Sequence, residues 1–343
     1  MSRHHDLIVV GGGPAGLATA LHAARAGLDA VVAEPRRAPV DKACGEGLMP
    51  GAVRALAALG LEAPGHPIRG IRYVQGHREV HAAFRHGPGL GVRRTDLHDL
   101  LHRAVLAAGV PVLPLRVGEV RQDAAGVSLP DAGLRGRWLV AADGLHSPIR
   151  RSLGLGLGSR GRPRYGLRRH YAVSPRSSYV EVHCGPQGEA YVTPLGPRLV
   201  GVALLTDRRA SFDAQLERFP ELAARLPAES AVSAVRGAGP LRQKTRTRLH
   251  GRVLLVGDAA GYVDALTGEG VSLALIGAEA LVGNVLRGTP DRYDGDWKRA
   301  TRRHRLLTTA LLRARQQRTL APLVVPAAER LPRVFAAVVN ALA

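Results

Sequence analysis

Three glycines near the start of the chain are spaced to bind the diphosphate of a dinucleotide. Gly11, Gly13 and Gly16 form a G-x-G-x-x-G turn after an apolar segment. In such a turn the first glycine permits a tight bend, the second leaves room for the diphosphate, and the third lets the next helix pack on the strand. Pro14 and Ala15 open that helix, and its N-terminus faces the phosphate charge.

The acidic residue expected of such a unit follows at the end of the second strand. Residues 30–33 are apolar and lead to Glu34, eighteen residues beyond Gly16. A carboxylate at this place accepts hydrogen bonds from the ribose hydroxyls. Because strand, helix, strand and acid occur in this order, the segment predicts a dinucleotide site rather than an ordinary glycine-rich turn.

Two later motifs place carboxylates after predicted strands. Asp143 begins a D-G-x-x-S-x-x-R sequence, and Asp258 lies in a G-D-A-A-G sequence that runs on to T-G-E-G at 267–270. Earlier in the chain, residues 42–50 read K-A-C-G-E-G-L-M-P, which is too rich in glycine to be a regular element. These three segments and the first unit are the candidates for one composite site.

Composition narrows the class of protein. The 343 residues suit two packed domains, and the two cysteines, Cys44 and Cys184, form no disulfide framework, which favours a reducing cytoplasm. The net charge of +20 comes almost wholly from arginine spread along the chain, and no nucleic-acid-binding motif accompanies it, so we expect no nucleic-acid partner. We expect no metal site, no signal peptide and no membrane span.

The hydrophobic pattern predicts the elements that position these motifs. Helices are expected over 14–26, 52–59, 95–108 (capped by Thr95) and 212–224, and after Gly270. Residues 166–172, 178–184, 190–194 and 199–205 alternate as antiparallel strands do. Shorter strands are expected at 71–74, 80–84, 112–115, 117–122, 127–129, 138–142 and 253–256. The last sixty residues read as arginine-rich helices.

The ordered motifs resemble the FAD-dependent oxidoreductases of the p-hydroxybenzoate hydroxylase fold, and are most similar to the geranylgeranyl-reductase-like branch. The resemblance covers residues 5–285. It implies an α/β fold: a Rossmann-like FAD-binding domain of the glutathione-reductase type, an antiparallel β-sheet substrate domain and C-terminal helices. The implied FAD-binding domain is discontinuous, over 1–70, 91–160 and 246–290. The substrate domain takes 71–90 and 161–245, and the helical segment 291–343.

The resemblance also implies which residues bind FAD, with reduced NAD(P)H as a transient reductant. Arg94 would reach the diphosphate, the Val117 backbone the adenine, Asp258 the ribityl chain, and the helix after Gly268 the flavin pyrimidine. The full implied set is Gly11, Gly13, Pro14, Ala15, Gly16, Glu34, Pro35, Arg36, Lys42, Cys44, Gly45, Arg94, Val117, Asp143, Gly257, Asp258, Gly268, Glu269, Gly270 and Val271.

Candidates for acid–base chemistry are fewer. Cys44 and Glu46 lie in the loop that the family places beside the flavin, while Tyr191 and His170 lie on predicted substrate-domain strands. Each also has a plain structural interpretation: Cys44 as a small apolar residue in a tight loop, Glu46 as a loop cap, and the other two as core or surface residues.

Three functions stay open. The first is hydroxylation of a hydrophobic phenol with NAD(P)H and O₂ through C4a-hydroperoxyflavin, since the 42–50 loop resembles that of flavin hydroxylases associated with type III polyketide synthases, which oxidise alkylresorcinol-like products. The second is reduction of isoprenoid double bonds. The third is a non-catalytic FAD-binding protein that docks on membranes, because residues 293–318 mix arginine with leucine; a solvated helix over the FAD domain is the alternative for that segment.

Overall fold

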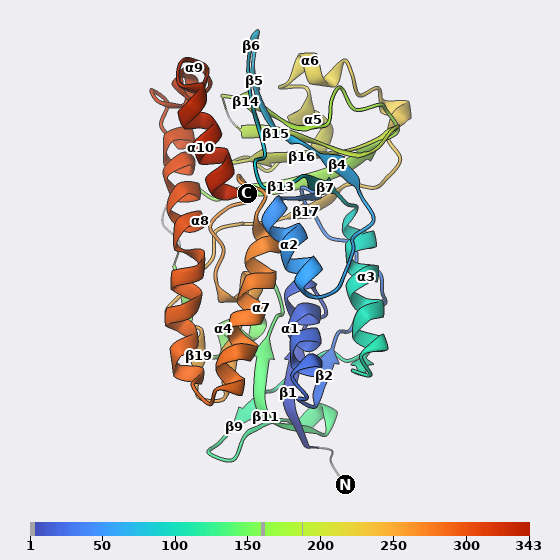
Figure 1. The fold of residues 1–343 in the computed structure, drawn as a ribbon, viewed down its shortest axis with the longest axis vertical. Coiled ribbons are helices and arrows are strands. Elements are labelled where there is room, and N and C mark those ends of the chain that lie inside the picture. The colour runs from blue at the N-terminus through green and yellow to red at the C-terminus, as the bar shows by residue number, and fades with distance from the viewer. Residues whose placement is uncertain (1–3, 159–161, 187) are drawn as a thin grey trace.

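The computed structural model describes residues 4–158, 162–186 and 188–343. The molecule is elongated, and its two large sheets lie one above the other along the long axis (Figure 1). The dinucleotide unit occupies the lower end, where the N-terminus lies, and the second sheet occupies the upper end. The predicted domain boundary between residues 160 and 161 lies outside the described residues.

The lower sheet is built around the N-terminal strand. Within the described ranges its strand order is β19-β20-β11-β1-β2-β8, with β10 and β9 added beyond β11. Strands β20, β11, β1, β2 and β8 run parallel. Leu7, Ile8 and Val9 are fully buried, as parallel strands covered on both faces require. The bounds are β1 (His4–Val10), β2 (Ala30–Ala33), β8 (Val112–Leu113), β9 (Arg121–Gln122), β10 (Val127–Leu129), β11 (Leu134–Ala141), β19 (Leu249–His250) and β20 (Val253–Leu255).

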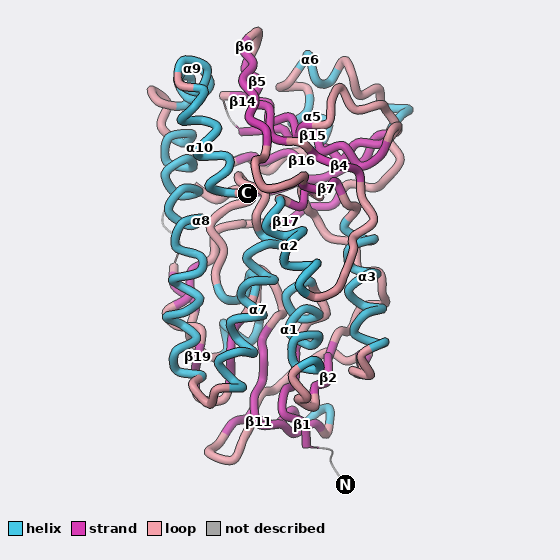
Figure 2. Tube along the Cα trace, in the orientation of Figure 1, coloured by secondary structure: helices cyan, strands magenta, loops and turns pink. Residues whose placement is uncertain are grey.

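Helices cover this sheet, as the helix and strand colours of Figure 2 show. They are α1 (Pro14–Arg25), α2 (Pro50–Ala58), α3 (Arg94–Ala107), α4 (Pro148–Ser152), α7 (Gly270–Leu286) and α8 (Tyr293–Gln316). Helix α1 packs against both α3 and α7, and α8 packs on α7. The expected cap at Thr95 is wrong. Helix α3 already begins at Arg94, and the Thr95 hydroxyl donates to Asp96 instead (3.1 Å).

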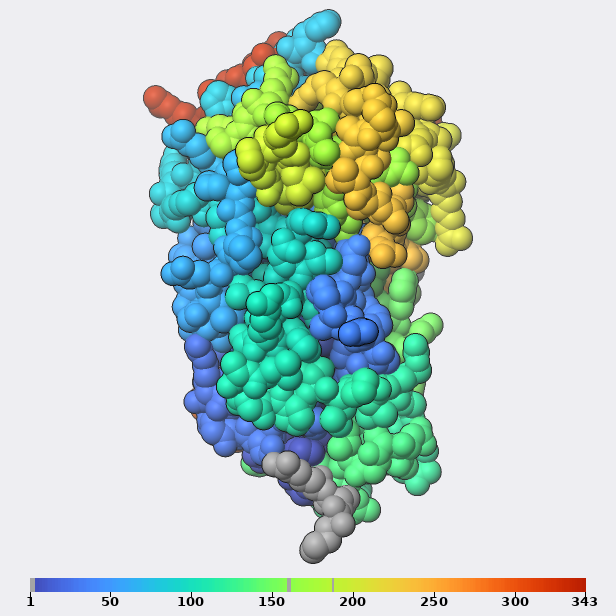
Figure 3. Space-filling model, turned by 90° about the vertical axis from the view of Figure 1, so that its right-hand side faces the viewer, coloured from blue at the N-terminus to red at the C-terminus, as the bar shows by residue number. Residues whose placement is uncertain are grey.

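The upper sheet has the strand order β17-β13-β16-β15-β14-β5-β6 within the described ranges. Its pairs are antiparallel except β14 with β5, which run parallel, and β5 comes from the first third of the chain. The bounds are β5 (Gly70–Gln75), β6 (Arg78–Ala83), β13 (Tyr165–Tyr171), β14 (Tyr179–Gly185), β15 (Gly188–Gly196), β16 (Leu199–Thr206) and β17 (Arg236–Ala238). Figure 3 shows residues of the first half of the chain (blue to green) forming the lower part of one face and reaching its top along one side, next to later residues (yellow to orange) that form the rest of the upper part.

Short elements join the two sheets. A small sheet of β3 (Gly47–Leu48), β7 (Gly89–Gly91) and β4 (His66–Ile68) lies between them, and β12 (Gly156–Leu157) pairs with β18 (Lys244–Thr245). The helix expected over 212–224 is instead two, α5 (Phe212–Leu216) and α6 (Pro220–Ala223). Pro220 lacks the N–H that would continue the first helix, so it starts the second.

Two C-terminal helices, α9 (Val324–Arg330) and α10 (Pro332–Leu342), fold back along the upper sheet. Both contact β6, and α9 also contacts β5 (Figure 1). The Phe335 ring packs edge-on against Tyr73, with centroids 5.2 Å apart. The end of the chain therefore covers one edge of the upper sheet. No helix in the described part of the chain is long and apolar enough to cross a bilayer.

Candidate active site

The three glycines of the first turn differ in what surrounds them. A Cβ on Gly11, where φ is +107°, would lie 2.4 Å from the Ala142 carbonyl oxygen, and one on Gly16 would lie 1.9 Å from the Gly11 oxygen. A Cβ on Gly13 would meet no atom within 4 Å. Thus Gly11 and Gly16 permit close packing of strand and helix, and Gly13 leaves an open cradle at the start of α1.

Two side chains behind this turn fix its backbone. The Gly12 amide donates to Glu34 Oε2 (2.9 Å), and Arg36 Nε donates to Glu34 Oε1 (2.7 Å). Although burial works to raise it, these hydrogen bonds hold the pKa of Glu34 below its ordinary value. His98 Nε2 donates to the Gly12 carbonyl (2.9 Å), and burial lowers the pKa of His98 to about 4. The turn therefore rests on an ionised Glu34 and a neutral His98.

A cavity of about 710 Å³ begins at the Gly13 cradle and runs into the upper sheet. All of the candidate motifs contribute to its wall. The predicted site residues that line it are Gly13, Pro14, Ala15, Lys42, Cys44, Gly45, Glu46, Arg94, Asp143, Tyr191, Gly257, Asp258, Gly268, Gly270 and Val271. Gly11, Gly16, Glu34, Pro35, Arg36, Val117, His170 and Glu269 are not among the lining residues.

Buried polar atoms face the lower part of this cavity without partners. Arg94 Nη1 and Asp143 Oδ1 have no hydrogen-bond partner among the described residues, although both are buried. Burial raises the pKa values of both Asp143 and Asp258. Buried polar atoms in native proteins are normally paired, so these positions indicate a polar ligand. An open glycine cradle, a guanidinium and two carboxylates fit the diphosphate and hydroxyl groups of a dinucleotide.

The loop that carries Cys44 is held against the upper sheet by buried polar contacts. Glu46 has a positive φ of 59°, between two glycines. Its Oε1 accepts from the Arg94 amide (2.8 Å), and its Oε2 accepts from His170 Nε2 (2.7 Å). Thr193 Oγ1 donates to the Gly45 carbonyl (2.7 Å). The carboxylate of Glu46 is thus occupied in fixing the loop.

The tautomer of His170 follows from its other neighbours. Arg168 Nη1 lies 3.2 Å from His170 Nδ1, and a guanidinium can only donate. Nδ1 therefore accepts a hydrogen bond, and Nε2 carries the hydrogen that is donated to the Glu46 carboxylate. Arg168 is fully buried and also pairs with Asp41 at the start of the loop. Sequence reasoning missed Arg168; the available signal was a pair of adjacent arginines, Arg168 and Arg169, in an alternating strand, where one of the two must face the covered side.

Cys44 and two tyrosines supply the protonated groups of the cavity wall. The Glu46 amide donates to Cys44 Sγ (3.4 Å), and burial raises the pKa of the Cys44 thiol. The Tyr191 hydroxyl donates to the Leu266 carbonyl (2.9 Å). Burial also raises the pKa values of Tyr191 and Tyr262. All three groups are protonated at neutral pH.

Helix α8 is attached to the far side of the site. The His304 imidazole lies against the Glu269 carboxylate, and the hydroxyls of Thr267 and Thr308 are 3.0 Å apart. Glu269 therefore does not line the cavity but joins the T-G-E-G segment to α8. Sequence alone offered no sign of this pairing.

The upper part of the cavity is apolar. Its wall comes from the sheet on one side and from the C-terminal helices on the other. The lining residues there are Ile71, Tyr73, Val180, Val182, Leu311, Val324, Ala327, Ala328, Leu331, Val334, Phe335, Val338, Val339 and Leu342. The sequence analysis missed this apolar arm, although the spacing of the valines and Phe335 in α10 is that of an amphipathic helix.

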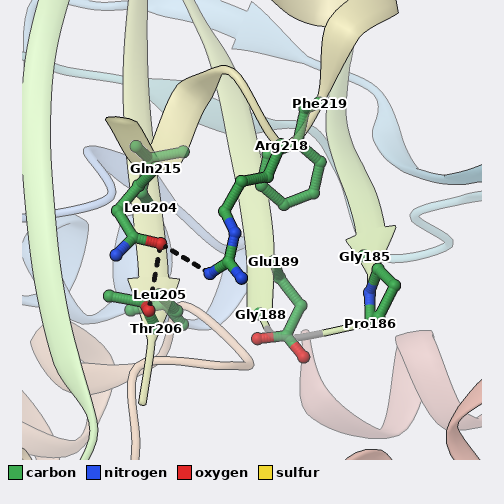
Figure 4. A pocket seen from close by; sticks show the side chains of 10 residues that line it. All are labelled: Gly185, Pro186, Gly188, Glu189, Leu204, Leu205, Thr206, Gln215, Arg218 and Phe219. Atoms are coloured by element: carbon green, nitrogen blue, oxygen red, sulfur yellow. Dashed lines mark hydrogen bonds between the residues drawn. The ribbon is translucent and has the colours of Figure 1, made fainter. Parts of the chain in front are cut away.

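A second cavity, of about 180 Å³, lies on the other side of β15 and β16 (Figure 4). The side chains of Thr206 and Arg218 both donate to Gln215 Oε1, at 3.2 and 3.1 Å. Glu189, at its edge, pairs with Arg164 (2.7 Å) and Arg315 (2.9 Å). Its polar groups bind one another, so the large cavity is the candidate active site.

Comparison with known proteins agrees with this geometry. Residues 4–292 match the FAD-binding-domain family, and the chain belongs to it. It is 32% identical to a menaquinone reductase of Mycolicibacterium smegmatis, over 89% of this chain and 82% of that protein. It is 28% identical to digeranylgeranylglycerophospholipid reductase 2 of Methanothermobacter thermautotrophicus, over 86% and 83%.

The fold is that of the p-hydroxybenzoate hydroxylase-like flavoproteins. The structure of p-nitrophenol 4-monooxygenase from Pseudomonas putida superposes with a TM-score of 0.82 at 22% identity, covering 100% of this chain and 99% of that one. The protein is therefore an FAD-dependent oxidoreductase, and the cradle at Gly13 with Arg94 and Asp143 fits its cofactor.

Proposed function

We propose that the protein reduces a carbon–carbon double bond in the isoprenoid chain of a lipid. The observation that carries this proposal is the apolar arm, which continues directly from the dinucleotide cradle and is closed by α9 and α10. A long, flexible hydrocarbon gains its binding energy from such a surface, at roughly 25 cal/mol per Å² of apolar area buried. The two relatives named as reductases of menaquinone and of a digeranylgeranyl lipid support the same substrate class.

The chain supplies binding, orientation and a proton. Arg94, Asp143 and Asp258 would hold FAD, which supplies a hydride to one carbon of the double bond when it is bound and reduced. The apolar arm orients the chain and excludes water from the reacting carbons. The second carbon needs a proton, and we propose the Cys44 thiol as its source. The Cys44 sulfur accepts a hydrogen bond from the Glu46 amide, and its S–H donates to no residue that the structure describes. The Tyr191 hydroxyl, in contrast, already donates to the Leu266 carbonyl.

Hydroxylation of a hydrophobic phenol, including one of polyketide origin, is the second candidate. The observation in its favour is the same enclosed, apolar surface beside the cofactor cradle, because a dry pocket protects oxygenated flavin from water. NAD(P)H is the reductant that we propose in either case.

One assay separates the two candidates. The purified flavoprotein would be reduced with NADPH or dithionite under argon and supplied with a geranylgeranyl lipid or a menaquinone in detergent. Reduction of a double bond predicts a product two mass units heavier, which for menaquinone is read after the quinol ring has been reoxidised in air, and no need for oxygen during turnover. An inert isoprenoid together with incorporation of ¹⁸O from ¹⁸O₂ into a phenol would overturn the reductase proposal in favour of hydroxylation.

A further inference from the structure

Exposed apolar side chains are concentrated in one short stretch of the chain. Leu320, Leu323, Leu331 and Val334 are 44%, 56%, 57% and 56% exposed. They are four of the nine exposed large hydrophobic residues in the described part of the protein, yet they fall within fifteen consecutive positions. Residues 317–334, which we call the docking segment, therefore carry an apolar surface that the rest of the fold does not cover.

The docking segment contains one opening of the large cavity. Leu331 and Val334 line this cavity and are more than half exposed. Ala327, one turn earlier on α9, also lines the cavity and is exposed. Side chains that contact both the cavity and the solvent mark an opening, so one mouth lies at the junction of α9 and α10. Lys42 and Arg236 are likewise exposed lining residues and mark a second opening beside the loop that carries Cys44.

The charges around the mouth at the α9–α10 junction are positive. Arg318, Arg330 and Arg333 are exposed, and none of them forms an ion pair with any residue that the structure describes. The one carboxylate of the segment, Glu329, is taken by Arg78 on β6 (2.6 Å). Three guanidinium groups without an ion-pair partner among the described residues thus lie in the same segment as the apolar mouth.

Helix α8, the segment that the sequence first suggested for membrane contact, is used differently. Leu312 is buried and Leu311 lines the cavity. Arg305 lies over the Trp297 ring (5.3 Å), and Arg315 binds Glu189. Leu306 of α8 is 59% exposed, so α8 keeps one exposed leucine, and the larger group of exposed apolar side chains lies beyond this helix.

We propose that the docking segment seats this mouth of the cavity on an anionic lipid bilayer, from which the isoprenoid substrate enters directly. Apolar side chains at the level of the acyl chains, flanked by arginines at the level of the phosphates, form the pattern of an interfacial membrane contact. The choice of a bilayer as the partner rests on charge complementarity and on the continuity of the surface with the cavity. The statement that substrate enters there rests on the proposed function.

The test is co-sedimentation of the full-length protein with two kinds of vesicle. One is phosphatidylcholine alone, and the other contains about 30% phosphatidylglycerol, an anionic lipid whose charge attracts arginines near the surface. Two variants alter the docking segment without touching the cavity wall: R330Q/R333Q and L320S/L323S. The matched control is R135Q/R137Q, which removes two exposed arginines from β11 at the opposite end of the molecule (Figure 1).

We expect the wild type and the control to sediment with anionic vesicles, and more weakly as salt rises. R330Q/R333Q should reduce the partition coefficient about tenfold or more, and L320S/L323S should reduce it on both vesicle types. Three results would overturn the proposal. The wild type could stay in the supernatant, or the partition coefficient could fall equally for R330Q/R333Q and the control. Light scattering could also show a dimer that the docking-segment variants dissociate. Vesicle binding without isoprenoid reduction would contradict only the proposed function. Isoprenoid reduction in detergent without vesicle binding would contradict only the proposed membrane docking.

Discussion

The carboxylate of Glu46 and the imidazole of His170 lie 2.7 Å apart, although 124 residues separate them in the sequence. The first belongs to the loop beside the cofactor cradle, and the second to a strand of the upper sheet. Their hydrogen bond, buried on both sides, is a direct link between the loop beside the cofactor cradle and the sheet whose other strands line the apolar arm. The position of Cys44, two residues earlier, depends on it.

Both partners of this hydrogen bond should be needed for full stability. His170→Ala leaves a buried carboxylate oxygen without its donor, and we expect the free energy of unfolding to fall by about 3 kcal/mol. Glu46→Gln keeps one acceptor oxygen, for the Arg94 amide, but turns an NH2 group toward the His170 N–H, so it should cost about 2 kcal/mol. Urea unfolding of both variants and of the double variant measures the coupling; strictly additive losses would show that the pair does not act as a unit.

Two glycine variants should separate folding from cofactor binding. Gly13→Val adds atoms to an open cradle, so the apoprotein should keep its Tm while its affinity for FAD falls at least about tenfold, because the diphosphate position is filled. Gly16→Val drives a side chain into the Gly11 carbonyl and should abolish folding. Flavin fluorescence titration and thermal unfolding measure the two effects. If the G13V protein retained its affinity for FAD, the diphosphate could not lie in the cradle at Gly13.

Acid should weaken the dinucleotide turn through His98. Its pKa in the folded protein is about 4, below the ordinary value of 6.5. The unfolded chain therefore binds a proton at His98 more tightly than the folded protein does. The stability that the folded protein has with His98 neutral is fully present above pH 6.5, and it is lost as the pH falls from about 6.5 to about 4. The full loss is about 3 kcal/mol.

The variant His98→Gln keeps a donor for the Gly12 carbonyl and cannot titrate. Its free energy of unfolding should change less than that of the wild type between pH 7 and pH 4.5. Parallel pH profiles of the two proteins, measured by urea unfolding, would rule out His98 as a source of the acid sensitivity.

Cys44→Ala tests the proposed proton donor. We expect product formation to slow by about 100-fold or more, the scale of a lost general acid, while FAD content and the rate of flavin reduction stay unchanged. Tyr262→Phe is the comparison, since the Tyr262 hydroxyl is another protonated group on this wall, whereas the Tyr191 hydroxyl donates to Leu266. If Y262F loses the activity and C44A keeps it, the tyrosine is the donor.

The apolar arm should set the length of chain that the enzyme accepts. Ala328→Phe fills the arm from α9, so turnover of long isoprenoids in detergent should fall while short ones are still reduced. Overpacking will cost about 1–3 kcal/mol, which thermal unfolding will register. Ala337→Phe places the same side chain on an exposed position of α10 that does not line the cavity, and should leave the length preference unchanged.

The local motifs could be predicted from the sequence because glycine and carboxylate positions at strand ends follow from backbone geometry. The turn at Gly11 and the carboxylates of Asp143 and Asp258 are of this kind. The hydrogen bond between His170 and Glu46 could not be predicted. The alternating pattern of a strand indicates which face of the sheet a residue lies on, but not which segment packs against that face. The apolar arm was missed for the same reason: α10 shows an amphipathic pattern, but only the folded chain shows that its apolar side meets Val182 across a cavity.

The insertion of the upper sheet between strands of the lower one has a consequence for biosynthesis. Strand β11 pairs with β1 early in the chain, but its other neighbour, β20, is translated only after the whole antiparallel sheet. The lower sheet therefore has a high contact order and closes late, whereas strands β13 to β16 are neighbours in sequence and pair locally. The wall of the cofactor cradle is thus completed by Asp258, a residue that is synthesised after every described strand of the upper sheet.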